Sequence, residues 1–453
     1  MPARFFSRFV ILISLCLASA ALTYASPNTE ALARKAVSEN SSESAQAIAE
    51  LRALGPAGLR VLFEVHADEI KRHATGGDAD FNSPQWQRLA AALDAVSQQR
   101  NDYLSMLYWY TDFERAKTAA KESGKPILSL RLLGNLNEEL SCANSRFFRT
   151  ALYSNAEISA ALRERFILHW KSVRPAPRIT IDYGDGRKFE TTITGNSIHY
   201  ILDAEGRVVD ALPGLYGPQT FLRELTQAEA VAKKVAGQKA QQSWETLRAY
   251  HDARIDAIAR DWAGDAEKVG VKVPAIEARN ADDKHPPSAR AAARMAVTKA
   301  ISEIGTINAI TYDARNLQQA TNDEAWLKIA SLHVEEARLD EMSRYLIRRQ
   351  NQNLREINGQ AAQAMTNDNL ISNLIEKFQS NLALDTVRNE YMLHTQIHAW
   401  LIGNRYLNDL DGLNERVYAQ LFMSPRSDPW LGLVVPDAYT GLQNGGVVLS
   451  GKE

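Results

Sequence analysis

A single cysteine is the most reactive side chain that this sequence offers. Cys142 opens the tetrapeptide Cys142-Ala143-Asn144-Ser145, so the chemistry open to it is that of one thiol three residues before a hydroxyl. The only other cysteine, Cys16, lies in an N-terminal segment that we expect to be removed. A mature chain with one thiol forms no intramolecular disulfide. Function therefore depends on whether Cys142 reacts with thiols or disulfides of other molecules.

The residues around Cys142 have opposite effects on the stability of its thiolate. At a helix N-terminus, unpaired amides and the helix dipole favour the thiolate, and Arg146 adds to this effect. Glu138 and Glu139 precede the cysteine and oppose it. Without a resolving partner, a mixed disulfide on Cys142 would persist until an external thiol cleaved it, which leaves exchange or capture as the available chemistry. The alternative is that Cys142 is a small, partly buried apolar residue.

The elements that must position Cys142 alternate between helix and strand. Gly124 and Pro126 mark the end of one helix and the start of an apolar strand, and Tyr183-Gly184-Asp185-Gly186 is typical of a hairpin turn. The expected order is helix 112–123, strand 127–133, a kinked helix 142–165, strand 166–173, hairpin strands 179–181 and 188–193, strands 198–202 and 208–212, and a helix from 218. This is a βαβ unit, then antiparallel strands, then a helix.

That order resembles the thioredoxin fold. The stretch 109–126 looks like the Trp, paired-Ala, Gly-Lys-Pro entry of secreted thioredoxin-like domains, and 142–162 falls where the active-site helix of that family begins and runs. The resemblance covers roughly residues 108–232, an ordinary size for one domain. By resemblance, Cys142 is the catalytic nucleophile and Ser145 stands where the family has its resolving cysteine.

Two further positions depart from the family pattern. Ser197 stands where the family has a cis-proline that faces the active cysteine, and Ser141 stands where a tryptophan precedes that cysteine. The resemblance implies that Asn196, Ser197 and Arg146 contact a substrate. It also implies an α/β thioredoxin-like domain, a central mixed sheet with flanking helices.

Two strand histidines offer a different chemistry. If His169 or His199 faced Cys142, it would act as the base of a Cys-His hydrolase or transferase. A histidine within a strand is more often a hydrogen-bonded core or edge residue. Asp182 and Asp185 could suggest calcium, but the later carboxylates of an EF-hand loop are missing, and a tight turn explains the pattern without metal.

Glu390, His394 and His398 recur every four residues, which puts a carboxylate and two imidazoles on one helix face. This spacing is compatible with a metal. The sequence has no HExxH pattern and no identified fourth ligand, and Ile397 and Trp400 form an adjacent apolar stripe. These observations favour a plain solvated or interface face. We therefore predict no metal and no cofactor.

The flanking regions read as helical and carry no recognisable catalytic motif. We predict a signal peptide over 1–25, an N-terminal helical region over 26–100, the thioredoxin-like domain over 105–232, a larger C-terminal all-α helical bundle over 236–425, and an extended tail over 426–453. Amphipathic stripes support the bundle, and a polar, proline-containing break interrupts it at 277–288.

The charge composition of the chain bears on which kinds of molecule it binds. The chain has 453 residues, of which 52 are basic and 54 acidic, and the net charge of −2 comes without a basic stripe, so nucleic acid is not an expected partner. Arg4 and Arg8 precede an apolar run and small residues, as in a secretory signal, so we expect an extracytoplasmic protein, periplasmic or secreted, with no stable membrane span after cleavage. Two hypotheses remain: thiol-disulfide exchange with a protein client through Cys142, or a non-catalytic scaffold or adaptor whose helical regions bind a protein partner.

Overall fold

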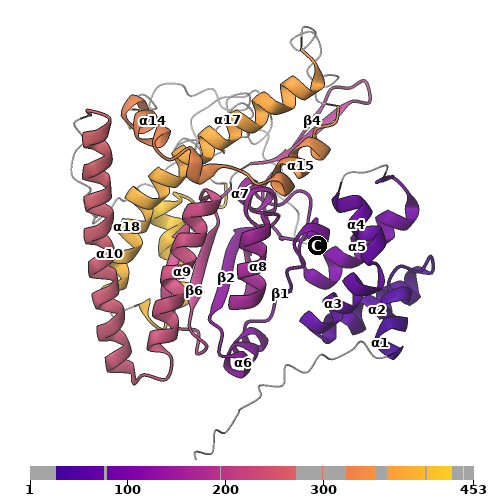
Figure 1. Ribbon diagram of the computed structural model, residues 1–453, viewed down its shortest axis with the longest axis horizontal. Coiled ribbons are helices and arrows are strands. Elements are labelled where there is room, and N and C mark those ends of the chain that lie inside the picture. The colour runs from indigo at the N-terminus through magenta and orange to yellow at the C-terminus, as the bar shows by residue number, and fades with distance from the viewer. Residues whose placement is uncertain are drawn as a thin grey trace, which may run out of the picture.

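The computed structural model describes residues 27–75, 79–193, 195–271, 298, 323–353, 365–403, 406–430 and 442. A mixed sheet lies at the centre, with N-terminal helices on one side and C-terminal helices on the other (Figure 1). This confirms the predicted mixed sheet with flanking helices between two helical regions. The expected signal segment, 1–25, lies outside the described residues.

Five helices and a 3₁₀ turn form the N-terminal layer: α1 (Pro27–Lys35), α2 (Ser41–Ala53), α3 (Pro56–Val65), α4 (Ala67–Ala74), α5 (Pro84–Ser97) and η1 (Asp102–Leu104). The Asn40 side chain caps α2 by accepting from two backbone amides. Gly55, at a φ of 69°, makes the turn between α2 and α3, where Pro56 begins the next helix. Leu51, Leu62 and Trp86 belong to a hydrophobic cluster that is separate from the cluster of the sheet.

The central sheet has five strands in the order β1-β3-β2-β6-β7. Their bounds are β1 (Trp109–Tyr110), β2 (Ile127–Leu133), β3 (Ile167–Arg174), β6 (Ile198–Leu202) and β7 (Val208–Pro213). The strands β1, β3 and β2 run parallel, whereas β6 and β7 pair antiparallel. Every residue of β2 is buried, as expected for a central strand covered on both faces. The four strands predicted for this sheet, β2, β3, β6 and β7, are confirmed, whereas β1 was not predicted.

Helices connect the parallel strands. Between β1 and β2 lies α6 (Phe113–Ser123), which begins at the capping side chain of Asp112 and ends at Gly124 in a left-handed conformation. Between β2 and β3 lie α7 (Ala143–Phe147), the π-helical turn η2 (Phe148–Leu152) and α8 (Ala156–Arg165). Asn155 caps α8 and accepts hydrogen bonds from two amides. The predicted interruption in this helix is therefore confirmed.

A two-stranded hairpin, β4 (Arg178–Asp182) and β5 (Lys188–Thr192), forms a separate sheet where the turn motif predicts one. Its two aspartates hold the turn. Asp182 accepts from the Gly184 amide at 2.9 Å, and Asp185 accepts from the Arg187 amide at 3.0 Å. These bonds account for both carboxylates without a metal ion.

The C-terminal helices pack on the sheet and share one hydrophobic cluster with it. They are α9 (Pro218–Val235), α10 (Ala240–Lys268), α14 (Asp323–Ser331), η4 (Glu335–Ala337), α15 (Glu341–Gln350), α17 (Asn367–Arg388), η6 (Asn389–His394), α18 (Thr395–Leu401), α19 (Leu410–Arg416) and η8 (Val417–Leu421). In Figure 1, α9 lies beside the sheet, and α10 lies outside it. The predicted break at 277–288 and most of the predicted tail lie outside the described residues.

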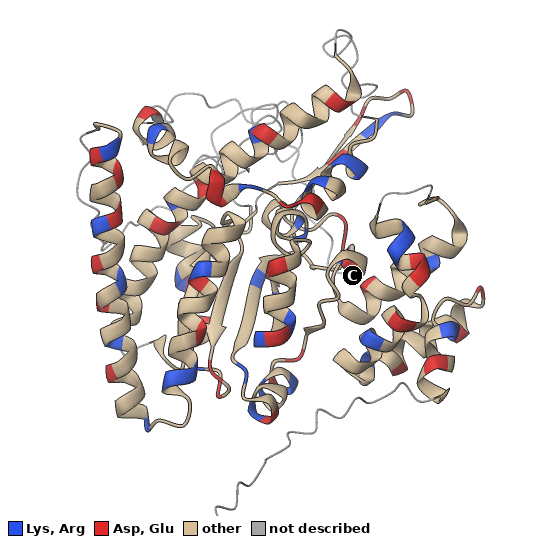
Figure 2. Cartoon of the chain, viewed as in Figure 1, with Lys and Arg blue, Asp and Glu red and all other residues tan. Residues whose placement is uncertain are grey.

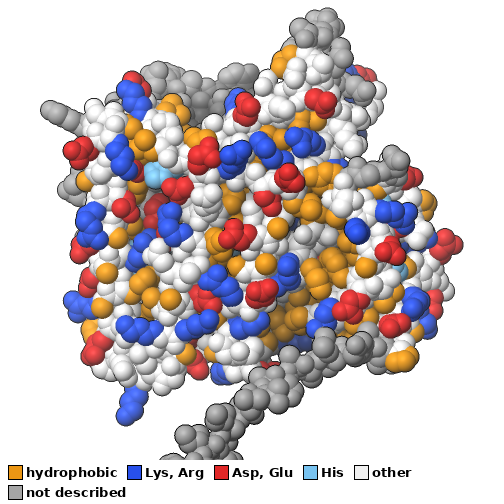
Figure 3. Space-filling view, viewed as in Figure 1, with side chains coloured by type: hydrophobic (Ala, Val, Ile, Leu, Met, Phe, Trp, Pro, Cys, Tyr) orange, Lys and Arg blue, Asp and Glu red, His pale blue; other side chains and the backbone are white. Residues whose placement is uncertain are grey.

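Charges of both signs are interspersed along the helices (Figure 2). On the face drawn in Figure 3, hydrophobic side chains gather where the N-terminal helices meet the rest of the molecule, and basic and acidic side chains alternate elsewhere. Across the described part of the chain, none of the helices combines the length and the apolar character needed to span a bilayer.

Candidate functional site

The thiol of Cys142 lies inside the protein. Cys142 is the N-cap of α7, as the sequence predicts, but its exposed fraction is 0%. Its Sγ lies 3.2 Å from the Oγ of Ser197, the residue just before β6. The structure therefore brings together the two positions that the resemblance places face to face, and buries both of them.

The other predicted site residues are engaged with the protein itself. Ser145 Oγ lies 2.8 Å from the Cys142 carbonyl oxygen and 2.6 Å from Ser141 Oγ. Arg146 donates to Thr192 Oγ1 at 3.2 Å, which ties α7 to β5. All of these contacts are internal and fix the backbone around the cysteine.

Asn196 is held by a segment from the far end of the described chain. Its Nδ2 donates to Ser424 Oγ at 2.9 Å and to the Phe422 carbonyl at 3.2 Å, and Tyr418 Oη donates to the Asn196 carbonyl at 2.8 Å. Residues 418–424 therefore lie against the loop that contacts the thiol. A client could not dock on this loop without displacing that segment.

Neither strand histidine is bonded to Cys142. His199 Nε2 lies 2.6 Å from Tyr153 Oη, and His169 Nδ1 lies 2.8 Å from Ser129 Oγ. Burial lowers the pKa of each imidazole to about 3, so both rings are neutral. Their hydrogen bonds are those of core residues, and the Cys-His hydrolase hypothesis finds no support in this geometry.

A second group of polar residues lies where the C-terminal helices meet the sheet. We call it the histidine-carboxylate cluster. Its members are Asp210 on β7, Glu224 on α9, Tyr250, His251 and Arg254 on α10, Glu390 and His394 on η6, and His398 on α18. His394 and His398 are fully buried and Glu390 is 8% exposed. The predicted Glu390-His394-His398 face is therefore an interface inside the protein, not a solvated surface, because it packs against β7 and α10.

The centre of the histidine-carboxylate cluster is a bridge through His394. Its Nε2 lies 3.0 Å from Asp210 Oδ1, and its Nδ1 lies 3.2 Å from Glu390 Oε2. Burial alone would lower the pKa of His394, but the two carboxylates outweigh it and raise that pKa to about 10. At neutral pH His394 is thus an imidazolium between two carboxylates.

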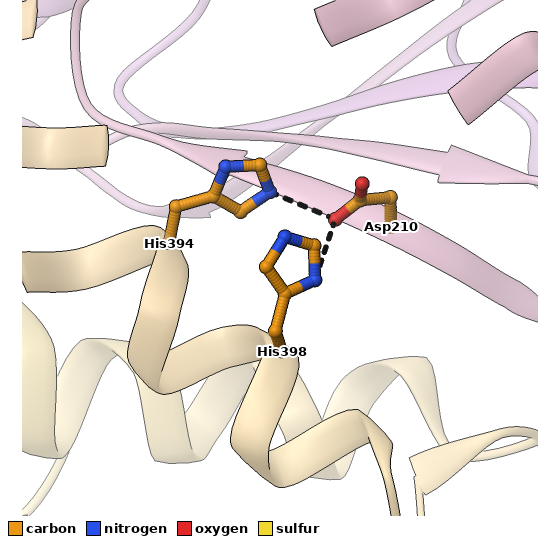
Figure 4. Close-up of side chains that lie close together, drawn as sticks. All are labelled: Asp210, His394 and His398. Carbon is orange, nitrogen blue, oxygen red and sulfur yellow. Dashed lines mark hydrogen bonds and ion pairs between the residues drawn. The ribbon is translucent and has the colours of Figure 1, made fainter. Parts of the chain in front are cut away.

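His398 approaches the same oxygen of Asp210 from the next helical turn, with its Nδ1 at 3.8 Å (Figure 4). That nitrogen also lies 2.9 Å from His251 Nδ1, so one ring donates and the other accepts. Burial lowers the pKa of His251 to about 4, and burial together with the charge on His394 lowers that of His398. Both rings are neutral. Within the described residues, His398 Nε2 has no hydrogen-bond partner.

Arg254 extends the cluster toward α9. Its Nη2 donates to Glu224 Oε2 at 2.6 Å and to Glu390 Oε1 at 2.8 Å. Burial and the neighbouring charge of Glu390 raise the pKa of Glu224. For Glu390 burial acts in the same upward sense, but His394 and Arg254 outweigh it and lower the pKa. The cluster therefore links β7, α9, α10 and η6 through charged hydrogen bonds.

Two overlapping triads in this cluster have ligand atoms within 4.8 Å of one another, which is close enough to hold a metal ion: Asp210 with His394 and His398, and Glu224 with Glu390 and His394. Hydrogen bonds already occupy both oxygens of Asp210. Oδ1 accepts from His394 and from the Ala211 amide, and Oδ2 accepts from Tyr250 Oη at 2.5 Å. Hydrogen-bond donors thus satisfy both oxygens of the Asp210 carboxylate, and the geometry supports a buried network of charged side chains.

Of this cluster, the sequence analysis found only Glu390, His394 and His398. Asp210, Tyr250 and His251 come from distant segments and belong to no motif. One signal does stand in the sequence, because Asp210 interrupts the apolar run Val208-Val209-Asp210-Ala211-Leu212. A charged residue in the middle of a buried strand needs a partner.

Compared with protein-family models, curated proteins and solved structures, this chain shows no match. A function for it must therefore be argued from its own side chains.

Proposed function

We propose that this protein is a non-catalytic scaffold built on a thioredoxin-like domain. Three parallel strands, two antiparallel strands and the crossover helices follow the order that the resemblance implies. Cys142 begins the helix after β2 and Ser197 precedes β6, which are the positions of the nucleophile and the cis-proline in that family. The proposal keeps the fold and assigns the cysteine a packing role.

The observation that carries this proposal is the complete burial of Cys142. A nucleophile must reach its substrate, and thiol exchange needs in-line access to sulfur. Here Sγ contacts Ser197, and the adjacent Asn196 is hydrogen-bonded to the 418–424 segment. His169 and His199, which were considered as bases, form hydrogen bonds with Ser129 and Tyr153 instead. A small apolar side chain explains this environment well.

In this proposal the helical regions supply the binding surface for a protein partner. The N-terminal layer has its own hydrophobic cluster, whereas the C-terminal helices share theirs with the sheet. The protein acts outside the cytoplasm, as the N-terminal sequence pattern predicts. Peptide sequencing of the N-terminus of exported protein tests that part, and a start within residues 21–26 is the expected result.

Iodoacetamide labelling of Cys142 tests the packing role. In the folded protein we expect no labelling over hours between pH 6 and 9, and complete labelling after denaturation in urea. Cys142→Ser provides the background, because a mature chain with this change has no thiol. Rapid labelling of the folded protein would contradict the proposal and support thiol exchange. Insulin reduction and disulfide isomerisation assays would then be the next measurements.

A further inference from the structure

A cavity of about 440 Å³ lies at the carboxyl ends of two parallel strands. Arg131 of β2 and Arg174 of β3 line one wall, and Tyr418 of η8 and Asn414 of α19 line the other. Its volume falls in the range of small-molecule sites. The carboxyl ends of parallel strands are also where open α/β sheets place their ligands.

Arg131 is a buried cation that the protein pairs poorly. Arg131 is 3% exposed. The carboxylate that faces it belongs to Asp411, whose side chain is 74% exposed and whose Oδ1 lies 3.8 Å from Arg131 Nη2. Nη1 donates to Ser129 Oγ at 2.8 Å, and Nε has no partner in the described part of the chain. Burial lowers the pKa of Arg131. A guanidinium in this position is costly unless an anion joins it.

Arg174, at the end of the neighbouring strand, is half-buried and is also poorly paired. Its two terminal nitrogens donate to the backbone carbonyls of Ser424 and Asp428 at 3.4 and 3.5 Å, which are long hydrogen bonds. Its buried Nε has no partner among the described residues. Burial lowers the pKa of Arg174 and outweighs the electrostatic effect of the Asp428 carboxylate. Two incompletely satisfied guanidiniums therefore line one cavity.

The charge of the lining supports the same conclusion. Four basic residues line the cavity against two acidic ones, Asp411 and Glu415, so the lining carries 4 − 2 = +2 charges. The basic residues are Arg131, Lys171, Arg174 and Arg426. Asp411 is shared, because it also lies 3.7 Å from Lys171 Nζ. Even with its own carboxylates counted, the cavity is left with positive charge that a ligand can neutralise.

We propose that this cavity binds a small organic anion through a carboxylate or phosphate group placed between Arg131 and Arg174. Guanidinium groups recognise both head groups with paired, charge-assisted hydrogen bonds. The site goes beyond the scaffold function and does not depend on the state of Cys142. The cavity lies beside the loop that contacts the thiol, because Tyr418 and Ser424 line the cavity and also form hydrogen bonds with Asn196 of that loop.

Isothermal titration calorimetry of the full chain at low ionic strength tests this site, with inorganic phosphate and succinate as probes. We expect saturable binding of at least one anion with a Kd below about 1 mM, and no heat from tetramethylammonium chloride. The anion that binds more tightly identifies the head group. No saturable binding of either anion up to about 20 mM would overturn the proposal, since such a site would be too weak to matter.

Three variants locate the binding. Arg174→Met should weaken it at least about tenfold, because it removes charged hydrogen bonds. Asp411→Asn should tighten it several-fold, since Asp411 competes for the same cations, and its exposed side chain can be changed without disturbing the core. Arg178→Met, on the exposed β4, is the matched control and should leave the Kd unchanged. Unchanged affinity in both Arg174→Met and Asp411→Asn would overturn the proposed location.

Discussion

The His394 bridge predicts a large, pH-dependent contribution to stability. His394→Gln keeps a similar size but removes the imidazolium, which leaves Asp210 and Glu390 as buried carboxylates without their shared cation. Breaking one partner of a buried ion pair costs about 3–5 kcal/mol. We therefore expect His394→Gln to lower the free energy of unfolding by about that amount at pH 6.

The pKa of His394 gives an independent magnitude and the sign of the pH dependence. A shift from an ordinary value near 6.5 to about 10 corresponds to roughly 5 kcal/mol of differential interaction, of the same order as the mutational figure. Because the folded-state pKa is raised, this stabilisation is fully present below pH 6.5. It declines as the pH rises above 6.5 and is lost as the pH passes 10, where the folded protein also loses the proton.

Urea unfolding followed by tryptophan fluorescence at pH 6, 8 and 10 measures the difference between wild type and His394→Gln. The difference should shrink steadily from pH 6 to pH 10. Lys328→Gln is the control, because it breaks an exposed helical pair with Glu324 and should cost no more than about 0.5 kcal/mol at any of these pH values. A loss below about 1 kcal/mol at pH 6, or a difference that grows with pH, would refute the imidazolium bridge.

Three further predictions concern the same regions. Tyr250→Phe removes the donor to buried Asp210 Oδ2 and should lower the free energy of unfolding by about 1–3 kcal/mol in the same urea assay, whereas an unchanged value would show that this bond is not formed. Gly217→Ala brings a Cβ within 2.7 Å of the Glu336 carbonyl oxygen and should cost about 1–3 kcal/mol, with Gly264→Ala, where the added Cβ meets open space, as the control for the glycine substitution itself. Treatment with EDTA should leave the Tm unchanged, because protons satisfy the histidine-carboxylate cluster, and a fall in Tm that zinc restores would contradict this.

Local sequence patterns were sufficient for most of the sheet. The strands Ile127–Leu133 and Ile198–Leu202 have the predicted bounds, and β4 and β5 flank the predicted turn. These elements are continuous apolar or alternating runs that end at glycine, proline or aspartate, so their limits are encoded by neighbours in sequence. The π-helical turns η2, η6 and η8 were not predicted, because a one-residue insertion in a helix leaves the apolar periodicity almost unchanged.

The candidate sites depend on contacts that no local pattern encodes. Asp210 and His394 are 184 residues apart, and Asn196 and Ser424 are 228 apart. Arg131 and Asp210 share one sequence signal, since each places a charge inside an otherwise apolar strand. That signal identifies a residue in need of a partner but does not name the partner. A partly buried Cys142 was one alternative from the sequence, but its complete burial could not be predicted, because it depends on packing between distant segments.

The contacts between the Cys142 region and distant segments also bear on the order in which the chain folds. The cysteine and the sheet that carries it are synthesised long before Tyr418 and Ser424, which hold the neighbouring Asn196 from more than two hundred residues away. Chains fold from the N-terminus as they emerge, and contacts of such long range form late. Before that segment docks, the loop that contacts the sulfur lacks its bonds to Tyr418 and Ser424, so the thiol is less enclosed in the nascent chain than in the finished protein. Oxidative damage at this position is a hazard of the nascent chain rather than of the finished protein.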